Sequence, residues 1–329
     1  MISFFPFQTM FLLTLISGTL IAVAAPSWFL AWLGLEVNLL SFIPLMTATT
    51  KHQEAEAATK YFLSQATGST LLLIGSTLTP TNGTLITIFG LLIKLGVPPG
   101  HFWFPSVMNA LPWASCILLA TWQKIAPLSL LSFSPSLTTS PMLPMIAAAS
   151  SLLGGFMGMN QSQLRPLLAY SSIGHLGWMI MLSTISPNMT MTYFIIYATI
   201  SVTIMSTLSL ASLTSLYSLS SPLQENRTLK LLLTALLLSL GGLPPFLGFM
   251  PKLLTLHAFA TSSLLLTTLP LILGSLINLF YYLSFSFTLI LPTNTTQLTT
   301  QPTTMKTPLL LSIMITLSLS ASILMSPFL

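Results

Sequence analysis

Apolar residues occupy this chain in long runs, separated by short stretches of prolines, glycines and small polar residues. Each run is near the roughly 20 residues that an α-helix needs to cross a bilayer. Threonine is tolerated in such helices because its hydroxyl can bond to a carbonyl one turn back. The pattern predicts an all-α polytopic membrane protein, one integral domain over residues 1–329, with about eleven transmembrane helices. Their predicted ranges are 3–24, 28–47, 57–78, 84–109, 113–131, 142–160, 166–185, 191–217, 228–258, 264–291 and 308–326.

The composition agrees with a protein embedded in a lipid bilayer. Only 4% of the 329 residues are charged, against about 25% in an ordinary soluble domain. The nine basic residues are scattered and form no patch for nucleic acid. One cysteine, Cys116, excludes an internal disulfide and a cysteine metal cage. The first residues lack the basic or arginine-rich character of a targeting peptide, so we interpret them as the first span.

Charged residues in or at the edges of the predicted loops follow even-numbered helices, whereas the odd-numbered loops carry no charge. Basic loops stay on the cytoplasm-like side of a membrane. We therefore expect the N-terminus and the even-numbered loops on that side and the C-terminus on the other. The charged residues that form this pattern are Lys51, Glu54, Glu56, Lys60, Arg165, Glu225, Arg227, Lys230 and Lys306.

Four ionisable residues fall inside predicted spans, namely Glu36, Lys94, Lys124 and Lys252. On insertion scales a lysine or aspartate at the centre of the bilayer costs about 2.5–3.5 kcal/mol. Groups this costly are normally retained for function, so each requires an explanation.

A proline-containing motif next to one of these lysines occurs twice. LGVPPGHFWFP, Leu95–Pro105, and GGLPPFLGFMP, Gly241–Pro251, share a glycine, a Pro-Pro pair and a final proline at identical spacing. Lys94 precedes the first copy and Lys252 follows the second. The copies lie on the fourth and ninth predicted helices, which run in opposite directions, so the two halves are predicted to form an inverted repeat. The halves are about 3–131 and 142–291, followed by a C-terminal helix at 308–326.

Proline explains why such a motif suits a lysine. It removes a backbone donor, clashes with the carbonyl one turn back and displaces the preceding residue from helical geometry. The freed carbonyls are tolerated only inside protein or beside water, where a lysine finds polar partners. The alternative is that the prolines kink packed helices and the lysines reach the interface. The matched lysine in both copies favours the functional interpretation.

A buried amine can exchange a proton near neutral pH because burial disfavours its charged form. A nearby carboxylate opposes this effect, and Glu36 is the one acid within a predicted span. Its contact with Lys94 is a hypothesis. Glu36, Lys94, Lys124 and Lys252 thus suggest a proton relay, whereas the alternative is static ion pairs that fix helix packing.

Three histidines are weaker candidates. His175, between Gly174 and Gly177, could extend the relay or serve as a satisfied core residue. His101 lies within the first motif, and His257 follows the second. The run GGFMG at 154–158 suits close helix packing. The chain shows no nucleotide-binding, CxxC or metal-ligand motif, so we expect no cofactor or metal in it.

Several blocks closely resemble the subunit 2 family of respiratory complex I, the mitochondrially encoded, antiporter-like membrane subunits of NADH dehydrogenase. They are AWLGLEVNLLSFIPLM, EAEAATKYFLSQATGS, KLGVPPGHFWFP, TWQKIAPLSLL, NQSQLRPLLAYSSIGHLGW and SLGGLPPFLGFMPK. The resemblance runs from about residue 28 to residue 328.

The resemblance implies a function and a cellular location. The function is proton translocation within NADH:ubiquinone oxidoreductase, driven by quinone reduction elsewhere in the complex. NADH, FMN, iron–sulfur clusters and ubiquinone would belong to the complex, with no redox centre in this chain. Implied partners are other membrane subunits, including NADH dehydrogenase subunits 4 and 4L, and the lipid bilayer, with no nucleic acid. The implied location is the mitochondrial inner membrane, with even loops in the matrix and the C-terminus in the intermembrane space.

The resemblance also assigns roles to residues. Glu36 matches the family glutamate, Lys94 the lysine of the first broken helix and Lys124 the central lysine. Lys252 matches the lysine of the second broken helix, and His175 stands where the family has a histidine.

Two positions depart from the family pattern: Gly100 and Ser106 replace a phenylalanine and an acid. A subunit of a cation/proton antiporter and a purely structural membrane subunit remain the alternative functions.

Overall fold

The computed structural model describes residues 6–48, 52–78, 80–211, 227–244, 246–261 and 265–290. Every regular element in these ranges is a helix. The first half holds α1 (Pro6–Val23), α2 (Trp28–Met46), α3 (His52–Thr77), α4 (Pro80–Leu95), α5 (Trp103–Ala110), α6 (Trp113–Ala120), α7 (Trp122–Phe133) and the short α8 (Pro135–Thr138). The second holds α9 (Met142–Met159), α10 (Leu164–Ser183), α11 (Pro187–Leu210), α12 (Arg227–Gly241), α13 (Phe249–Thr261) and α14 (Leu265–Ile290).

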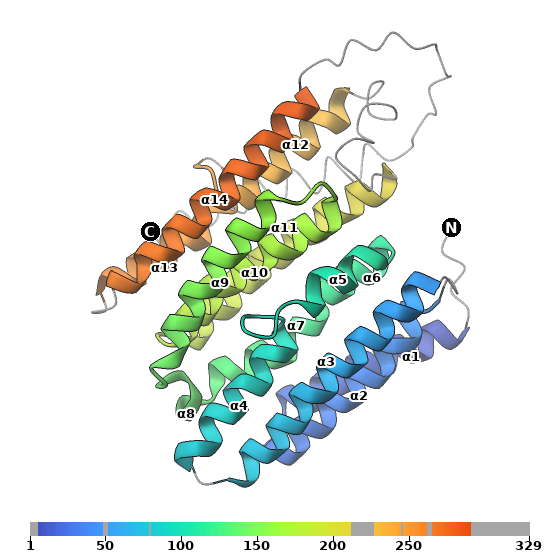
Figure 1. Ribbon diagram of the computed structural model, residues 1–329, viewed down its shortest axis with the longest axis vertical. Coiled ribbons are helices and arrows are strands. Elements are labelled where there is room, and N and C mark those ends of the chain that lie inside the picture. The colour runs from blue at the N-terminus through green and yellow to red at the C-terminus, as the bar shows by residue number, and fades with distance from the viewer. Residues whose placement is uncertain are drawn as a thin grey trace.

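The helices run roughly side by side in an elongated bundle. Figure 1 shows α1 to α3 along one edge and α12 to α14 along the opposite edge, with α9 to α11 between them. Helices α4, α5 and α7 pack between the first edge and this middle group. The arrangement places the centre of the bundle far from lipid, where an ionisable group can be kept.

The prediction of an all-α membrane protein is confirmed. In the described part, five helical stretches are long and apolar enough to cross a membrane: Trp28–Met46, Trp113–Phe133, Met142–Met159, Pro187–Leu210 and Thr267–Leu289. Large apolar side chains on the bundle surface, such as Leu13, Leu20 and Phe280, are more than half exposed, as expected where lipid replaces water. The count of eleven spans stays a prediction, because 308–326 lies outside the described residues, as do Lys51, Glu225 and Lys306.

Some helix ends differ from the predicted ranges. Helix α3 begins at His52 rather than near residue 57, so Glu56 and Lys60 lie on a helix and not in a loop. Hydropathy marks the bilayer edge, whereas the helix itself continues into water. There the Lys60 ammonium bonds the Glu56 carboxylate at 2.6 Å, and this contact lowers the pKa of Glu56 below its usual value.

Hydroxyl groups in the apolar helices bond to their own backbone, as predicted. Thr70 donates to the Thr67 carbonyl at 2.9 Å, and Ser172 donates to the Ala169 carbonyl at 2.7 Å. Each such bond satisfies the hydroxyl without a second helix. The small-residue run on α9 also packs as predicted, because a side chain at Gly154 would lie 2.7 Å from the Gly174 nitrogen of α10.

Both proline motifs interrupt helices. Helix α4 ends at Leu95 and α5 begins at Trp103, while α12 ends at Gly241 and α13 begins at Phe249. The prediction of a broken helix at each motif is therefore confirmed for these residues, although Pro245 lies outside the described residues. The inverted relation between the two halves stays a prediction.

Candidate functional site

The two breaks begin with the same capping geometry. Gly96 and Gly242 have φ of 73° and 80°, a left-handed conformation that glycine adopts without a steric penalty. In the first break the Gly96 nitrogen bonds the Ile93 carbonyl and the Val97 nitrogen bonds the Leu92 carbonyl. The second break repeats this pattern with Gly242 and Leu243 as donors. Both are Schellman caps, which end a helix while satisfying some of its last carbonyls.

Lys252 uses a carbonyl that the second break leaves free. Its amine comes from α13, is 7% exposed, and donates to the Gly241 carbonyl at 2.8 Å. A cation at the C-terminal end of α12 also interacts favourably with the helix dipole. The expectation that the break supplies polar partners for this lysine is confirmed.

Lys94 lies in the last turn of α4, at the corresponding end of a half-helix, and is 5% exposed. Gln65 of α3 donates to the Lys94 backbone carbonyl at 3.3 Å. The half-buried Glu36 of α2 is near enough to act electrostatically on the Lys94 amine and on Tyr61. No ion pair within 4.0 Å joins Glu36 and Lys94 among the residues that the structure describes, so the two charges are near each other without direct contact.

Lys124 lies in the middle of the bundle and is 2% exposed. Helix geometry fails just before it, at Thr121, which separates α6 from α7. This irregularity was not predicted from the sequence. Pro127, one turn further on, has no N–H for the Gln123 carbonyl. The backbone around Lys124 is therefore unusually polar for the middle of a membrane helix.

A small cavity of about 10 Å³ lies between Lys94 and Lys124, near the minimum that one water molecule requires. Tyr61, Gln65 and Gln123 line it together with the two lysines. The Tyr61 hydroxyl donates to Gln123 at 3.3 Å, and Gln123 donates to Asn38 of α2 at 3.0 Å. These amide and hydroxyl groups connect the helices that carry Glu36, Lys94 and Lys124.

His175 of α10 occupies the space between the central lysine and the second break. The charges of both Lys124 and Lys252 act on its ring. Its Nδ1 lies 3.0 Å from the Tyr193 hydroxyl, and its ring centroid lies 5.3 Å from that of Tyr197. Tyr197 in turn faces the Lys124 amine, 5.6 Å from the ring centroid. His175 is thus a titratable group on which the charges of both Lys124 and Lys252 act.

The five candidates are therefore linked in pairs: Glu36 acts on Lys94, Lys94 and Lys124 line one cavity, and Lys124 and Lys252 act on His175. Sequence analysis did not select the polar groups between them, Tyr61, Gln65, Gln123, Tyr193 and Tyr197, because glutamine and tyrosine carry no distinctive motif. Two weaker candidates stay apart. His101 is buried against Phe102, with ring centroids 4.1 Å apart, and His257 lies farther along α13, near its end.

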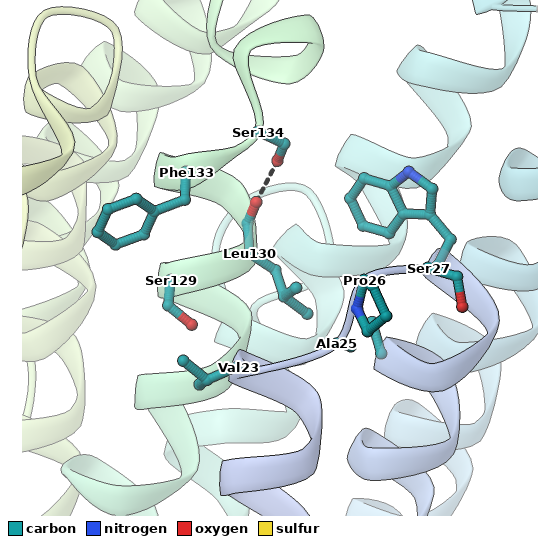
Figure 2. Close-up of a pocket in the computed structure, with 10 residues that line it drawn as sticks. Val23, Ala25, Pro26, Ser27, Ser129, Leu130, Phe133 and Ser134 are labelled. Carbon is teal, nitrogen blue, oxygen red and sulfur yellow. Dashed lines mark hydrogen bonds between the residues drawn. The ribbon is translucent and has the colours of Figure 1, made fainter.

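A larger cavity lies elsewhere and is unrelated to these charges. It has a volume of about 240 Å³ between the α1–α2 turn and the end of α7. Figure 2 shows Pro26 and Ser27 on one side and Ser129, Leu130 and Phe133 on the other, with the Ser134 hydroxyl donating to the Leu130 carbonyl. The residues that line it include no ionisable side chain. In the described part of the chain, no group of three or more His, Cys, Asp or Glu side chains could hold a metal ion.

Comparisons with known proteins bear on the family and the fold of this chain. The family model for the NADH:quinone oxidoreductase/Mrp antiporter membrane region matches residues 25–85 and 76–278. The NADH-ubiquinone oxidoreductase chain 2 of Lumbricus terrestris is 44% identical over 288 residues, 85% of each chain. The chain belongs to the NADH-ubiquinone oxidoreductase chain 2 family. The Papio hamadryas member is 40% identical over 305 residues, 87% of each chain.

Solved structures share the fold of this family member. The chain matches a subunit of respiratory complex I from Thermus thermophilus with a TM-score of 0.81 and 24% identity, covering 95% of this chain and 77% of the other. A chain of the Mrp complex from Dietzia sp. DQ12-45-1b matches with a TM-score of 0.77 and 19% identity, covering 88% and 62%. Membership makes the protein a multi-pass membrane subunit of NADH-ubiquinone oxidoreductase, an H⁺-translocating complex.

Proposed function

We propose that this subunit conducts protons along the membrane arm through Glu36, Lys94, Lys124, His175 and Lys252. The observation that supports the proposal most is the cavity that Lys94 and Lys124 line together. The charge of Glu36 acts on Lys94, and the charges of Lys124 and Lys252 act on His175. Each step would move one proton from an ammonium or imidazolium to the next neutral base through intervening water. The cavity between Lys94 and Lys124 has room for about one such water.

The energy would come from quinone reduction elsewhere in the complex. A change in charge at Glu36 alters the field at Lys94 and therefore its preference for a proton. Two inverted halves, about 3–131 and 142–291, would then exchange charge through Lys124 and His175. The shared Schellman caps at Gly96 and Gly242 support this division.

We further propose an inner mitochondrial membrane location with eleven spans and the C-terminus in the intermembrane space. Neighbouring membrane subunits would include NADH dehydrogenase subunits 4 and 4L. The even-numbered loops would face the matrix. A bond between the helix ends next to two of these loops supports a common side, because Arg165 at the start of α10 donates to the carbonyl of Asn109 near the end of α5 at 3.1 Å. No cofactor is expected within this subunit.

Replacement of Lys94 or Lys252 by methionine tests the relay. Methionine keeps much of the length and apolar volume of lysine but cannot carry a proton. We expect assembled complex that oxidises NADH more slowly and moves fewer protons per NADH. Unchanged proton pumping in a fully assembled complex would refute the relay. Loss of assembly alone would favour a structural subunit, and sodium transport that persists without NADH oxidation would favour a cation/proton antiporter.

A further inference from the structure

The Lys124 amine is held in an unusual way. It is buried and has no hydrogen-bond partner among the described residues. Instead it lies 4.6 Å from the centroid of the Phe104 ring and 5.6 Å from that of Tyr197. A cation over an aromatic face is attracted by the ring quadrupole, and more strongly when water is excluded. The two rings are therefore the groups that favour the charged form of this lysine.

Phe104 also contacts the first helix break. It belongs to the first turn of α5, and its nitrogen bonds the His101 carbonyl at 3.1 Å. A side chain built at Gly96 would meet Phe104 Cβ at 3.0 Å, so the backbone at the cap packs directly on this residue. Trp103, its neighbour, donates to the Ile93 carbonyl at 3.0 Å and ties α5 to the last turn of α4.

One side chain thus contacts both the cap that follows Lys94 and the amine of Lys124. Phe104 is 1% exposed, so it has little freedom to move independently of its neighbours. Close packing transmits a shift of the break to the ring and from the ring to the amine, because the space beside the ring among the described residues is a cavity of about 10 Å³ that Phe104 helps to line. The corresponding position in the second break is Met250, which has no aromatic face.

We propose that Phe104 is a positioning residue that couples the first helix break to the protonation of Lys124. When the charge at Lys94 changes, the backbone at Gly96 shifts and moves the ring relative to the Lys124 amine. A ring close to the amine favours the ammonium form, and a displaced ring favours release of the proton. This inference rests on the relay proposed above and names the contact that would link its first two lysines.

Other titratable groups around Lys124 come from each neighbouring helix. Lys94 of α4 and Tyr61 of α3 lie across the small cavity, Tyr197 lies on α11, and His175 lies on α10. All of them are retained in a variant that changes only Phe104. The test therefore isolates the ring.

The test uses the assembled complex in proteoliposomes with Phe104→Leu, Phe104→Met and Phe104→Tyr. Leucine and methionine fill much of the space without an aromatic face, while tyrosine keeps the face. We expect the first two to lower the protons moved per NADH and to shift the alkaline limb of the pH profile downward by about one unit, a tenfold loss of the ammonium form. Phe104→Tyr should retain the wild-type profile.

Two further variants make the result decisive. Phe133→Leu makes the same change at a side chain that is 57% exposed on α7, and it should leave the pumping profile unchanged. Lys124→Met should remove pumping. If Phe104→Leu behaves like Phe133→Leu while Lys124→Met fails to pump, the coupling role is wrong and the relay stands. If Lys124→Met pumps normally, both proposals are wrong.

Discussion

The break after α4 and the break after α12 end their helices with the same hydrogen-bond pattern around a glycine of positive φ. Both place a lysine at the carbonyl end of a half-helix, yet by different routes. Lys94 belongs to the helix that ends there, whereas Lys252 belongs to the next helix and reaches back to the Gly241 carbonyl. The two breaks therefore share their backbone geometry but differ in the charges around their lysines.

The difference concerns what can change the proton affinity of each amine. Lys94 lies in the field of Glu36, a charge on another helix that can itself be altered. Lys252 bonds to a backbone carbonyl, whose partial charge is fixed. In the described part of the chain no carboxylate lies within 4.0 Å of Lys252. In the proposed relay, the proton affinity of Lys94 would respond to a change of charge at Glu36. Lys252 would hold its proton until the protonation of His175 or Lys124 changes.

The largest effect should come from alanine at the two capping glycines. A non-glycine residue in left-handed geometry costs about 1–2 kcal/mol, so Gly96→Ala and Gly242→Ala should both reduce the amount of assembled complex. The methyl group at position 242 would also lie 2.7 Å from Lys252 Nζ. The charge-assisted hydrogen bond from Lys252 to the Gly241 carbonyl, which contributes about 1.5–3 kcal/mol, would be lost as well.

We therefore expect Gly242→Ala to lower pumping per assembled complex more than Gly96→Ala does. Native gels quantify assembly, and proton uptake into vesicles measures pumping. Equal pumping by the two variants, after correction for assembly, would show that the Lys252–Gly241 bond is unimportant.

A smaller and more selective effect is expected from Glu36→Gln, which keeps the shape of the side chain and removes its charge. An opposite charge close to an amine favours its ammonium form, by about one pH unit or more for a close pair. Without the carboxylate, the ammonium form of Lys94 loses support, so the alkaline limb of the pumping profile should move to lower pH, by less than about one unit because the two groups form no ion pair.

Hydrogen exchange at the amides around Gly241 provides the control for Glu36→Gln. It should be unchanged, since Glu36 acts on the first break alone. A pumping profile that stays at its original pH would show that Glu36 is not the switch for Lys94.

The comparison also shows what sequence patterns can and cannot predict. Hydropathy predicted the five helical stretches that are long and apolar enough to cross a membrane, because lipid exposure demands apolar side chains. The Gly/Pro spacing located both breaks because proline removes backbone donors. The inward-facing side chains were not predictable in the same way. A helix that is apolar on all sides gives no periodic signal for its rotation. Gln65, Gln123 and Tyr197 could therefore not be assigned to the site.

The same reasoning applies to the central region. Thr121, where α6 gives way to α7, has neither glycine nor proline to mark it. His175 was recognisable as a candidate from its Gly-His-Leu-Gly context and its family position. Its place between Lys124 and Lys252 depends on long-range packing of α10 against α7 and α13, which local sequence does not encode.

Gln65→Leu tests whether a side-chain hydrogen bond stabilises the first break. Its expected effect is smaller than those above. Gln65 donates to the Lys94 carbonyl across α3 and α4, and a hydrogen bond of this kind contributes about 1 kcal/mol. Leucine fills a similar space, so we expect a small loss of thermal stability, measured as the midpoint of inactivation of the purified complex. Gln161→Leu is the matched control, because the half-buried Gln161 side chain makes a solvent-exposed bond to the Met157 carbonyl of its own turn. A loss no greater than in that control would mean that the bond does not support the break.

The smallest effect is expected at Gly100, which corresponds to the much larger Phe246 in the second break. A methyl group at position 100 would meet Ile93 Cγ1 at 2.8 Å, and a change in the Ile93 χ1 angle would relieve this contact. Rotation away from its preferred angle costs about 0.5–1.5 kcal/mol. Reduced freedom of the unfolded chain returns about 0.4–1 kcal/mol. Gly100→Ala should therefore leave assembly and thermal stability nearly unchanged, in contrast to Gly96→Ala in the same break. A loss as large as that of Gly96→Ala would mean that the first break depends on the tight Gly100–Ile93 contact as well as on its cap.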